Sequence, residues 1–281
     1  MTDLGILSRP RFEMLPTRGA EEHLAHLPEG AKVAVTCSPT KGIESTLRFS
    51  EGLLRRGFRV VPHVASRLVA DEAHLEKVLR WFDEHGLREI YVIGGDAKEP
   101  VGPYASALEL LGAMSHLEHG VEEVGIGGYP EGHPLIDDRE LDRALVDKQP
   151  LASYVVTQLC FDADTILGWI SGIRDRGIML PVYVGLPGAV DRKKLLQISL
   201  KVGVGDSVRF LRKQSGLVGM LLKPGGYSPD ELVERLAPYA GDEHYDIAGL
   251  HLYTFNQVEN TEQWRQRMLG TKKVSGTGAL R

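Results

Sequence analysis

Polar and ionisable side chains lie at or just beyond the carboxyl-terminal ends of most of the short apolar segments of this 281-residue chain. They are acids, amides, hydroxyls and imidazoles, with little positive charge among them: Glu13, Thr36, His63, Asp96, Tyr129, Glu131, His133, Gln158 and Asn256. Carboxyl groups and imidazoles can move protons, while amides and hydroxyls can orient a ligand. This set of groups suits a neutral heteroaromatic substrate rich in donors and acceptors, and it suits a polyphosphate poorly.

The three strongest candidates each have a structural alternative. Glu13 lies between apolar residues, where a carboxyl group is either a proton donor or half of an ion pair, and we favour the acid. Asp96 follows two glycines and would also suit a turn. His63 follows a proline, and a hydrogen-bonded structural histidine there is as reasonable as a ligand-binding one.

The remaining candidates are weaker. Gln158 lies deep in an apolar segment, where a buried amide needs either a backbone network or a ligand. Asn256 has the composition of a turn residue, and Thr36 is a common strand residue. His133 precedes a proline and could simply shape a loop.

The segments before these residues alternate between strand and helix patterns. Strands are expected at 11–14, 32–37, 58–64, 89–94, 123–128, 153–161, 180–186 and 249–255. Helices are expected at 43–56, 71–85, 103–120, 137–148, 163–176 and 191–214, with another beginning at Ser228. Eight βα units in a chain of this length predict an α/β fold, a single (β/α)8 TIM barrel over 1–269, with a flexible tail at 270–281. The carboxyl ends of all eight strands would then meet at one face.

Two rival architectures lack their sequence signals. A doubly wound dinucleotide-binding sheet needs a glycine-rich turn after its first strand, yet residues 13–19 read EMLPTRG. The glycines at 125–128 are followed by Tyr-Pro, where a phosphate-binding fingerprint requires a helix to open. A serine hydrolase elbow of the form Gly-x-Ser-x-Gly is absent from the sequence.

Composition narrows the class of protein further. The net charge is −5, and no basic stripe indicates nucleic acid as a partner. We expect no membrane span and a cytoplasmic location, because neither a long apolar run nor a signal sequence is evident. Cys37 and Cys160 lie in apolar runs and are expected to be buried thiols, and no metal site is expected. The oligomeric state is left open, a homo-oligomer included.

Several motifs resemble those of the methylenetetrahydrofolate reductase family. In chain order they are FEMLPTR from Phe12, PHV from Pro62, GD at Gly95, YPEGHP from Tyr129, TQLCFD from Thr157 and LYTFN from Leu252. Together they span nearly the whole chain, and YPEGHP with TQLCFD is the most specific combination.

The resemblance implies a role for each candidate residue. Glu13 matches the acid that assists protonation and opening of the imidazolidine ring of 5,10-methylenetetrahydrofolate at N10. Asp96 matches the carboxylate placed against the pterin, and Gln158 matches the amide that binds it, with Asn256 completing the expected substrate set. Positions that line the flavin in flavin-containing members correspond to Thr36, His63, Tyr129 and His133. Here these four, with Gln158, are expected to contact NADH or NADPH instead.

Two departures from the family pattern predict that FAD is absent. Flavin-containing members have an arginine where this chain has Gly94, and a lysine where it has Asp147. Losing both cations should cost several kcal/mol of binding to a flavin diphosphate, although Lys148 would compensate in part if the alignment shifts by one residue.

We therefore expect direct hydride transfer from NAD(P)H to the folate. The alternatives are an FAD-dependent ping-pong reductase and a silent folate-binding barrel. A barrel with unrelated chemistry, such as a luciferase-like monooxygenase, would not require the YPEGHP and TQLCFD motifs.

Overall fold

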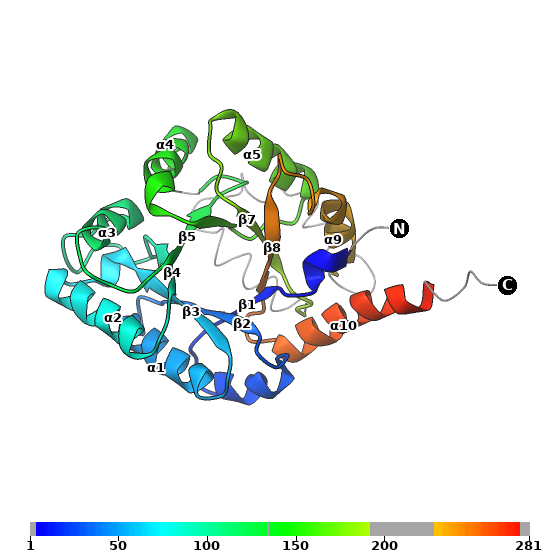
Figure 1. Ribbon diagram of the computed structural model, residues 1–281, viewed down its shortest axis with the longest axis horizontal. Coiled ribbons are helices and arrows are strands. Elements are labelled where there is room, and N and C mark those ends of the chain that lie inside the picture. The colour runs from blue at the N-terminus through cyan, green and yellow to red at the C-terminus, as the bar shows by residue number, and fades with distance from the viewer. Residues whose placement is uncertain (1–3, 134, 192–227, 276–281) are drawn as a thin grey trace.

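The computed structural model describes residues 4–133, 135–191 and 228–275 of the chain. Within these residues, parallel strands form a closed barrel in sequence order, and the last strand pairs with the first (Figure 1). The strands are β1 (Arg11–Met14), β2 (Lys32–Val35), β3 (Arg59–Ala65), β4 (Glu89–Ile93), β5 (Glu123–Gly128), β6 (Tyr154–Thr157), β7 (Val182–Pro187) and β8 (Ile247–Tyr253). The expected TIM barrel is confirmed.

Helices surround the strands, as Figure 1 shows. The α-helices are α1 (Gly42–Leu54), α2 (Glu72–Glu84), α3 (Ala107–Met114), α4 (Asp138–Lys148), α5 (Ala163–Asp175), α9 (Asp230–Leu236) and α10 (Val258–Ser275). Short 3-10 helices are η1 (Leu4–Leu7), η2 (Ala20–His26), η3 (Ser66–Leu68), η4 (Gln149–Leu151) and η5 (Ala237–Tyr239). Side-chain caps fix several starts: the Asp71 carboxylate accepts from the His74 N–H at 2.8 Å, and Ser106 forms a capping box with Glu109.

Some boundaries differ from the sequence prediction. The helix expected from residue 103 begins only at Ala107, because the Ser106 cap fixes its first turn. β6 ends at Thr157, so the TQLCFD motif from Gln158 onward lies in the loop. Ser228 does not cap α9; its hydroxyl donates to the Asp230 carboxylate instead. Nearly all of the helix expected at 191–214 lies outside the described residues.

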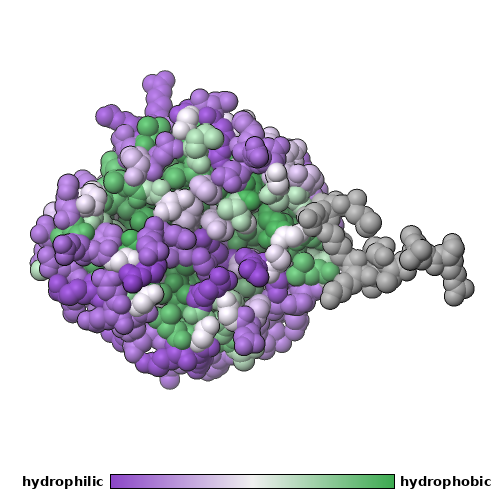
Figure 2. Space-filling model, viewed as in Figure 1, coloured by the Kyte–Doolittle hydropathy of each residue, from purple (hydrophilic) through white to green (hydrophobic). Residues whose placement is uncertain are grey.

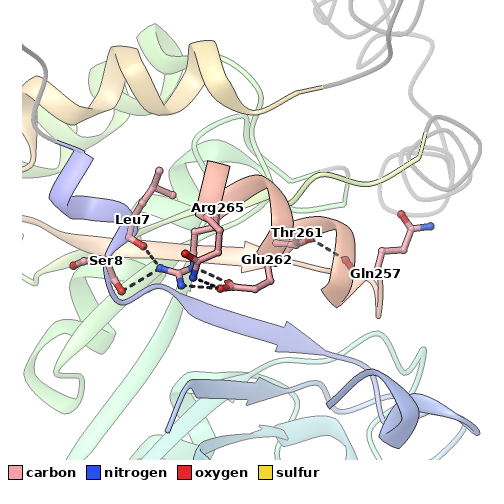
Figure 3. A network of polar contacts seen from close by, with 7 residues as sticks. Leu7, Ser8, Gln257, Thr261, Glu262 and Arg265 are labelled. Atoms are coloured by element: carbon pink, nitrogen blue, oxygen red, sulfur yellow. Dashed lines mark hydrogen bonds and ion pairs between the residues drawn. The ribbon is translucent and has the colours of Figure 1, made fainter. Parts of the chain in front are cut away.

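Helix α10 contacts the segment that precedes the first strand. Arg265 of α10 donates to the carbonyls of Leu7 at 2.9 Å and Ser8 at 3.3 Å, and Glu262 of the same helix holds its guanidinium (Figure 3). This contact fixes η1 just before β1 begins. α10 continues to Ser275, past the boundary expected at 269, and the rest of the expected tail lies outside the described residues.

The side chains of β1 divide between two cores. Phe12 and Met14 join the large apolar core, which packs against the helices. Alternation along the strand places Arg11 and Glu13 on the opposite face, inside the barrel. The Arg11 guanidinium lies 3.7 Å from the Tyr183 ring centre and 4.1 Å from that of Tyr154, on strands across the barrel. The barrel interior is therefore polar as well as aromatic.

On the face shown in Figure 2, apolar side chains form separate areas between hydrophilic ones. In the described part of the chain, no helix combines the length and apolarity needed to cross a membrane.

Candidate active site

A carboxylate–imidazole pair lies inside the barrel. Glu13 Oε2 is 3.1 Å from His251 Nε2, and the two side chains are 12% and 2% exposed. The backbone of Glu13 is also held, since Thr254 Oγ1 donates to its carbonyl at 2.6 Å. Glu13 therefore lies in a half-buried position inside the barrel, where a general acid could act, and its partner His251 was not predicted from the sequence.

Tyrosine rings surround this pair. Tyr253 follows His251 by two residues on the same face of β8, and their ring centres are 5.0 Å apart. Burial, then the Glu13 carboxylate, raises the pKa of Tyr253 well above its usual value. Burial also raises the pKa of Tyr91 on β4, with smaller contributions from neighbouring tyrosines and Glu13. Both phenols therefore stay protonated at neutral pH and can only act as neutral hydrogen-bonding groups.

His63 lies beside the same pair. Its ring centre is 4.5 Å from that of Tyr91 and 6.5 Å from that of His251. Burial lowers the pKa of His63 well below its usual range, and His251 adds to the shift, so the imidazole is neutral. Its Nε2 atom is buried and has no hydrogen-bond partner among the described residues. A buried nitrogen without a partner is one that a ligand could satisfy.

A second group of predicted residues meets at the rim of the barrel. Burial raises the pKa of Tyr129, and the carboxylate of the exposed Asp96 raises it further. His133 packs edge-on against Tyr129 with ring centres 5.3 Å apart. Burial lowers the pKa of His133, and Asp96 opposes part of that shift. The structure thus brings Asp96, Tyr129 and His133 together.

We call Glu13, His251, His63, Tyr91 and Tyr253 the inner group, and Asp96, Tyr129 and His133 the rim group. The two groups adjoin at Gly127 of β5. A methyl group at this position would lie 3.4 Å from the Tyr129 hydroxyl and 3.5 Å from the Tyr91 hydroxyl. Tyr91 belongs to the inner group and Tyr129 to the rim, so the missing side chain leaves room where the two groups meet.

The loop that carries Asp96 is fixed by the residues after β3. The Gly94 carbonyl accepts from the Ser66 hydroxyl and from the Arg67 N–H, each at 3.1 Å. Arg67 also donates to the carbonyls of Lys98 and Ala105. Ser66 and Arg67 therefore fix the backbone of the loop that carries Asp96, although the Asp96 carboxylate is exposed.

Thr36 follows β2 next to β1, and Gln158 follows Thr157, whose carbonyl accepts from the Tyr253 hydroxyl at 3.0 Å. The Thr36 N–H donates to the Met14 carbonyl at 3.0 Å, next to Glu13. The Gln158 side-chain carbonyl accepts from the N–H of Leu159 at 2.8 Å. Among the described residues, the Gln158 NH₂ has no hydrogen-bond partner.

Asn256 holds the loop after β1. Its side-chain oxygen accepts from the Leu15 N–H at 2.9 Å, and its NH₂ donates to the Leu15 carbonyl and to Thr17 at 3.0 and 2.9 Å. Both amide hydrogens are therefore used within the protein, which agrees with a loop residue better than with a direct donor to substrate.

The two positions that depart from the family pattern lie on different elements of the barrel. Gly94 follows β4, and a methyl group added there would meet nothing within 4 Å. Asp147 is exposed on α4, and its carboxylate lies 3.8 Å from Arg143. Lys148 lines a cavity of about 510 Å³ between α4 and α5, which Tyr129 also borders. Burial lowers the pKa of Lys148 to about 8.

Neither cysteine takes part in this site. Cys37 and Cys160 are buried and free, as expected, although each lies just beyond its strand. Burial raises the pKa of the Cys160 thiol to about 12, so it is unreactive at neutral pH. The described residues contain no group of three or more histidines, cysteines or acids arranged to hold a metal ion.

The interior residues His251, Tyr91 and Tyr253 were not predicted from the sequence. The predicted residues lie near the ends of the expected strands, whereas Tyr91 lies in the middle of β4, and His251 and Tyr253 lie inside the strand expected at 249–255. A signal was available, because residues 249, 251 and 253 alternate to one face of a strand that pairs with β1.

The described barrel thus holds an acid–imidazole pair inside and a carboxylate, a phenol and an imidazole at its rim, which are groups that proton-transfer chemistry can use. The sequence profile of methylenetetrahydrofolate reductase matches residues 28–201. The chain belongs to the methylenetetrahydrofolate reductase family, which confirms the resemblance of its motifs.

Curated relatives agree with this assignment. A probable methylenetetrahydrofolate reductase (NADPH) of Caenorhabditis elegans is 26% identical over 207 residues, covering 68% of this chain and 29% of the relative. Methylenetetrahydrofolate reductase 1 of Schizosaccharomyces pombe is 31% identical over 65 residues, or 22% of this chain and 11% of the relative. The matched segment is thus less than a third of either relative.

Solved structures support the fold alone. A chitinase from Bacteroides thetaiotaomicron superposes with a TM-score of 0.53 at 10% identity, covering 92% of this chain and 97% of the chitinase. This likeness concerns the barrel and carries no information about chemistry.

Proposed function

We propose that this chain reduces 5,10-methylenetetrahydrofolate to 5-methyltetrahydrofolate with NADH or NADPH as hydride donor. The observation that carries the proposal is the position of Glu13, whose side chain is 12% exposed inside the barrel, below a rim that holds Asp96. Family membership supplies the substrate class.

The proposed chemistry needs one proton and one hydride. Glu13 gives a proton to N10, the bond between N10 and the methylene carbon breaks with its electron pair going to N10, and a cationic N5-iminium remains. Asp96 offers that cation a fixed negative charge. The nicotinamide C4 supplies the hydride that converts the methylene carbon into a methyl group.

The binding roles follow the same division. Thr36, His63, Tyr129, His133 and Gln158 are proposed to contact the nicotinamide cofactor. Asp96 and Gln158 are proposed to contact the pterin, Gln158 through its NH₂, which has no partner within the described part of the chain. Asn256 is proposed to act on the substrate side by holding the loop after β1, since both of its amide hydrogens are already used.

The residues fit a flavin diphosphate poorly, so we propose transfer without FAD. No cation stands at Gly94, and Asp147 adds a negative charge where the family has a lysine. Lys148 favours the alternative, an FAD-dependent ping-pong reductase, because its amine borders a cavity next to Tyr129. With a pKa of about 8, however, Lys148 is an incomplete replacement for two permanent cations.

The absorption spectrum of the purified protein, with turnover measured in the same preparation, tests this proposal. We expect oxidation of NAD(P)H that depends on methylenetetrahydrofolate, without a flavin spectrum. Stoichiometric flavin whose removal abolishes turnover would contradict flavin independence. Binding of folate without any turnover would instead indicate a silent folate-binding barrel.

A double variant tests the physical reason for flavin loss. Gly94→Arg with Asp147→Lys should increase FAD affinity by about 10²-fold or more, because two charge-assisted contacts return. Gly94→Ala with Asp147→Asn is the matched control: it removes the negative charge but restores neither cation, so it should gain far less FAD affinity than the charged double variant. Equal FAD affinity in both double variants would contradict the charge argument.

A further inference from the structure

His251 is a buried histidine whose contact with Glu13 gives it a specific task. It lies on β8, is 2% exposed, and shares a hydrogen bond of 3.1 Å with Glu13 Oε2. The inference below rests on the proposed function, in which Glu13 is the acid.

The strands place the pair in fixed register. β8 lies beside β1, with His251 opposite Arg11 and Tyr253 opposite Glu13. Thr254, one residue beyond Tyr253, donates to the Glu13 carbonyl at 2.6 Å. β8 and the residue after it therefore hold Glu13 twice, His251 at its side chain and Thr254 at its main-chain carbonyl.

The unpaired nitrogen of His251 indicates which group donates. Nδ1 is buried and has no hydrogen-bond partner among the described residues. If Glu13 donated its proton to Nε2, neutral His251 would carry its own hydrogen on Nδ1 as an unsatisfied buried N–H, and the hydrogen bond would be lost once Glu13 becomes a carboxylate, which can only accept. A doubly protonated imidazole would have the same unsatisfied N–H. The arrangement therefore favours Nε2–H as donor and Glu13 Oε2 as acceptor.

This hydrogen bond makes the two oxygens of Glu13 unequal. Oε2 is occupied by His251, while Oε1 has no hydrogen-bond partner in the described part of the chain. Because the Nε2–H bond also stabilises a carboxylate, it favours the form of Glu13 that remains after proton donation.

We propose that His251 is the positioning residue of Glu13: it holds Oε2, so that the transferred proton leaves from Oε1. In the step itself the Oε1–H bond breaks and an N–H bond forms at N10 of the folate. The electron pair of the broken bond stays on the Glu13 carboxylate, which keeps its hydrogen bond from His251 Nε2–H. His251 is neutral before and after the step and does not touch the substrate.

Two substitutions separate the hydrogen bond from the packing of the ring. His251→Leu removes the donor and should lower kcat about 10–100-fold with little change in KM, which is the loss of one hydrogen bond to a charged group. His251→Gln can place an amide N–H near the position of Nε2 and should recover most of that loss. His85→Leu, a histidine that stacks on Trp81 of α2 away from the site, is the control and should turn over like the wild type.

A double-mutant cycle separates positioning from a general structural effect. Once Glu13→Gln has removed the acid, adding His251→Leu should change the remaining kcat by less than about twofold, because His251 acts through Glu13. An equal loss of kcat in both backgrounds would overturn the proposal, and so would wild-type kcat in His251→Leu.

The nitrogen NMR signals of the His251 ring test the donor assignment without turnover. The wild type should show a neutral ring with its hydrogen on Nε2. A hydrogen on Nδ1, or on both nitrogens, would overturn the assignment even if Glu13→Gln is inactive. Lack of reductase turnover in the wild type would instead overturn the proposed function and, with it, the catalytic role of His251.

Discussion

Replacing Glu89 with glutamine should leave a buried guanidinium without its counter-charge. Glu89 on β4 is 11% exposed and accepts from Arg11, which is 3% exposed, at 2.5 Å, and also from Lys32. These residues open their strands, so the cluster lies at the amino-terminal end of the barrel interior. Breaking a buried ion pair by removing one partner costs about 3–5 kcal/mol. The rings of Tyr154 and Tyr183 still stabilise the Arg11 cation after the substitution. We therefore expect a loss at the lower end of that range, about 3 kcal/mol.

Urea unfolding followed by circular dichroism measures this loss. The free energy of unfolding falls by about 3 kcal/mol per molar urea. A loss of about 3 kcal/mol should therefore lower the urea midpoint of Glu89→Gln by about 1 M. Glu123→Gln is the matched control, because Glu123 is the register partner of Glu89 on β5 but is exposed. Its midpoint should stay within about 0.2 M of the wild type.

The difference should also depend on pH. Burial acts to raise the pKa of Glu89, but Arg11 and Lys32 outweigh it and the net shift is downward. A group with a lowered folded pKa stabilises the fold above its unfolded value, about 4.3, and loses that contribution as the pH falls through the folded value. Wild type and Glu89→Gln should therefore converge in acid. A midpoint of Glu89→Gln equal to that of Glu123→Gln at neutral pH would refute the reasoning.

Three further predictions concern the site. Glu13→Gln should lower kcat by about 10²–10⁴-fold while folate affinity, measured by calorimetry, stays near wild type; unchanged kcat would reassign Glu13 to a structural pair. Asp96→Asn should also lower kcat, since the charge opposite the cationic intermediate is lost while the shape is kept, and the initial rate at saturating folate checks this. Gly95→Ala should destabilise the fold by about 1–3 kcal/mol and reduce kcat, because φ at Gly95 is +88° and the new methyl group would lie 2.8 Å from the Ala65 Cβ. Gly94→Ala is its control, and equal effects of the two substitutions in urea unfolding would show the turn argument to be wrong.

The fold was predictable because each strand is an apolar segment bounded by helix patterns. The expected 11–14 and 123–128 strands coincide with β1 and β5, and the others differ by a few residues at their ends. Such ends depend on local hydrogen bonds that composition does not reveal. Ser106, for example, starts α3 four residues later than expected.

The candidate site was predictable where residues lie near the carboxyl-terminal ends of strands, as Glu13, His63 and Asp96 do. Asp96, Tyr129 and His133 meet at the rim, as barrel topology requires of strand ends. The Glu13–His251 pair joins residues 238 positions apart, and closure of β8 onto β1 brings them together. For Asn256 the sequence predicts a substrate contact, and only the structure shows that Leu15 and Thr17 already accept both of its amide hydrogens.

The order in which substrates bind tests the central claim, direct hydride transfer without a flavin. Without a bound carrier the hydride cannot be stored, so NAD(P)H and folate must occupy the barrel together, with the reacting carbons about 3–3.5 Å apart. Initial rates at several fixed folate concentrations should then give intersecting double-reciprocal lines, and deuterium from the labelled nicotinamide should reach the product methyl group undiluted. Parallel lines, or loss of the label to solvent, would mean that a carrier takes up the hydride and would contradict the account.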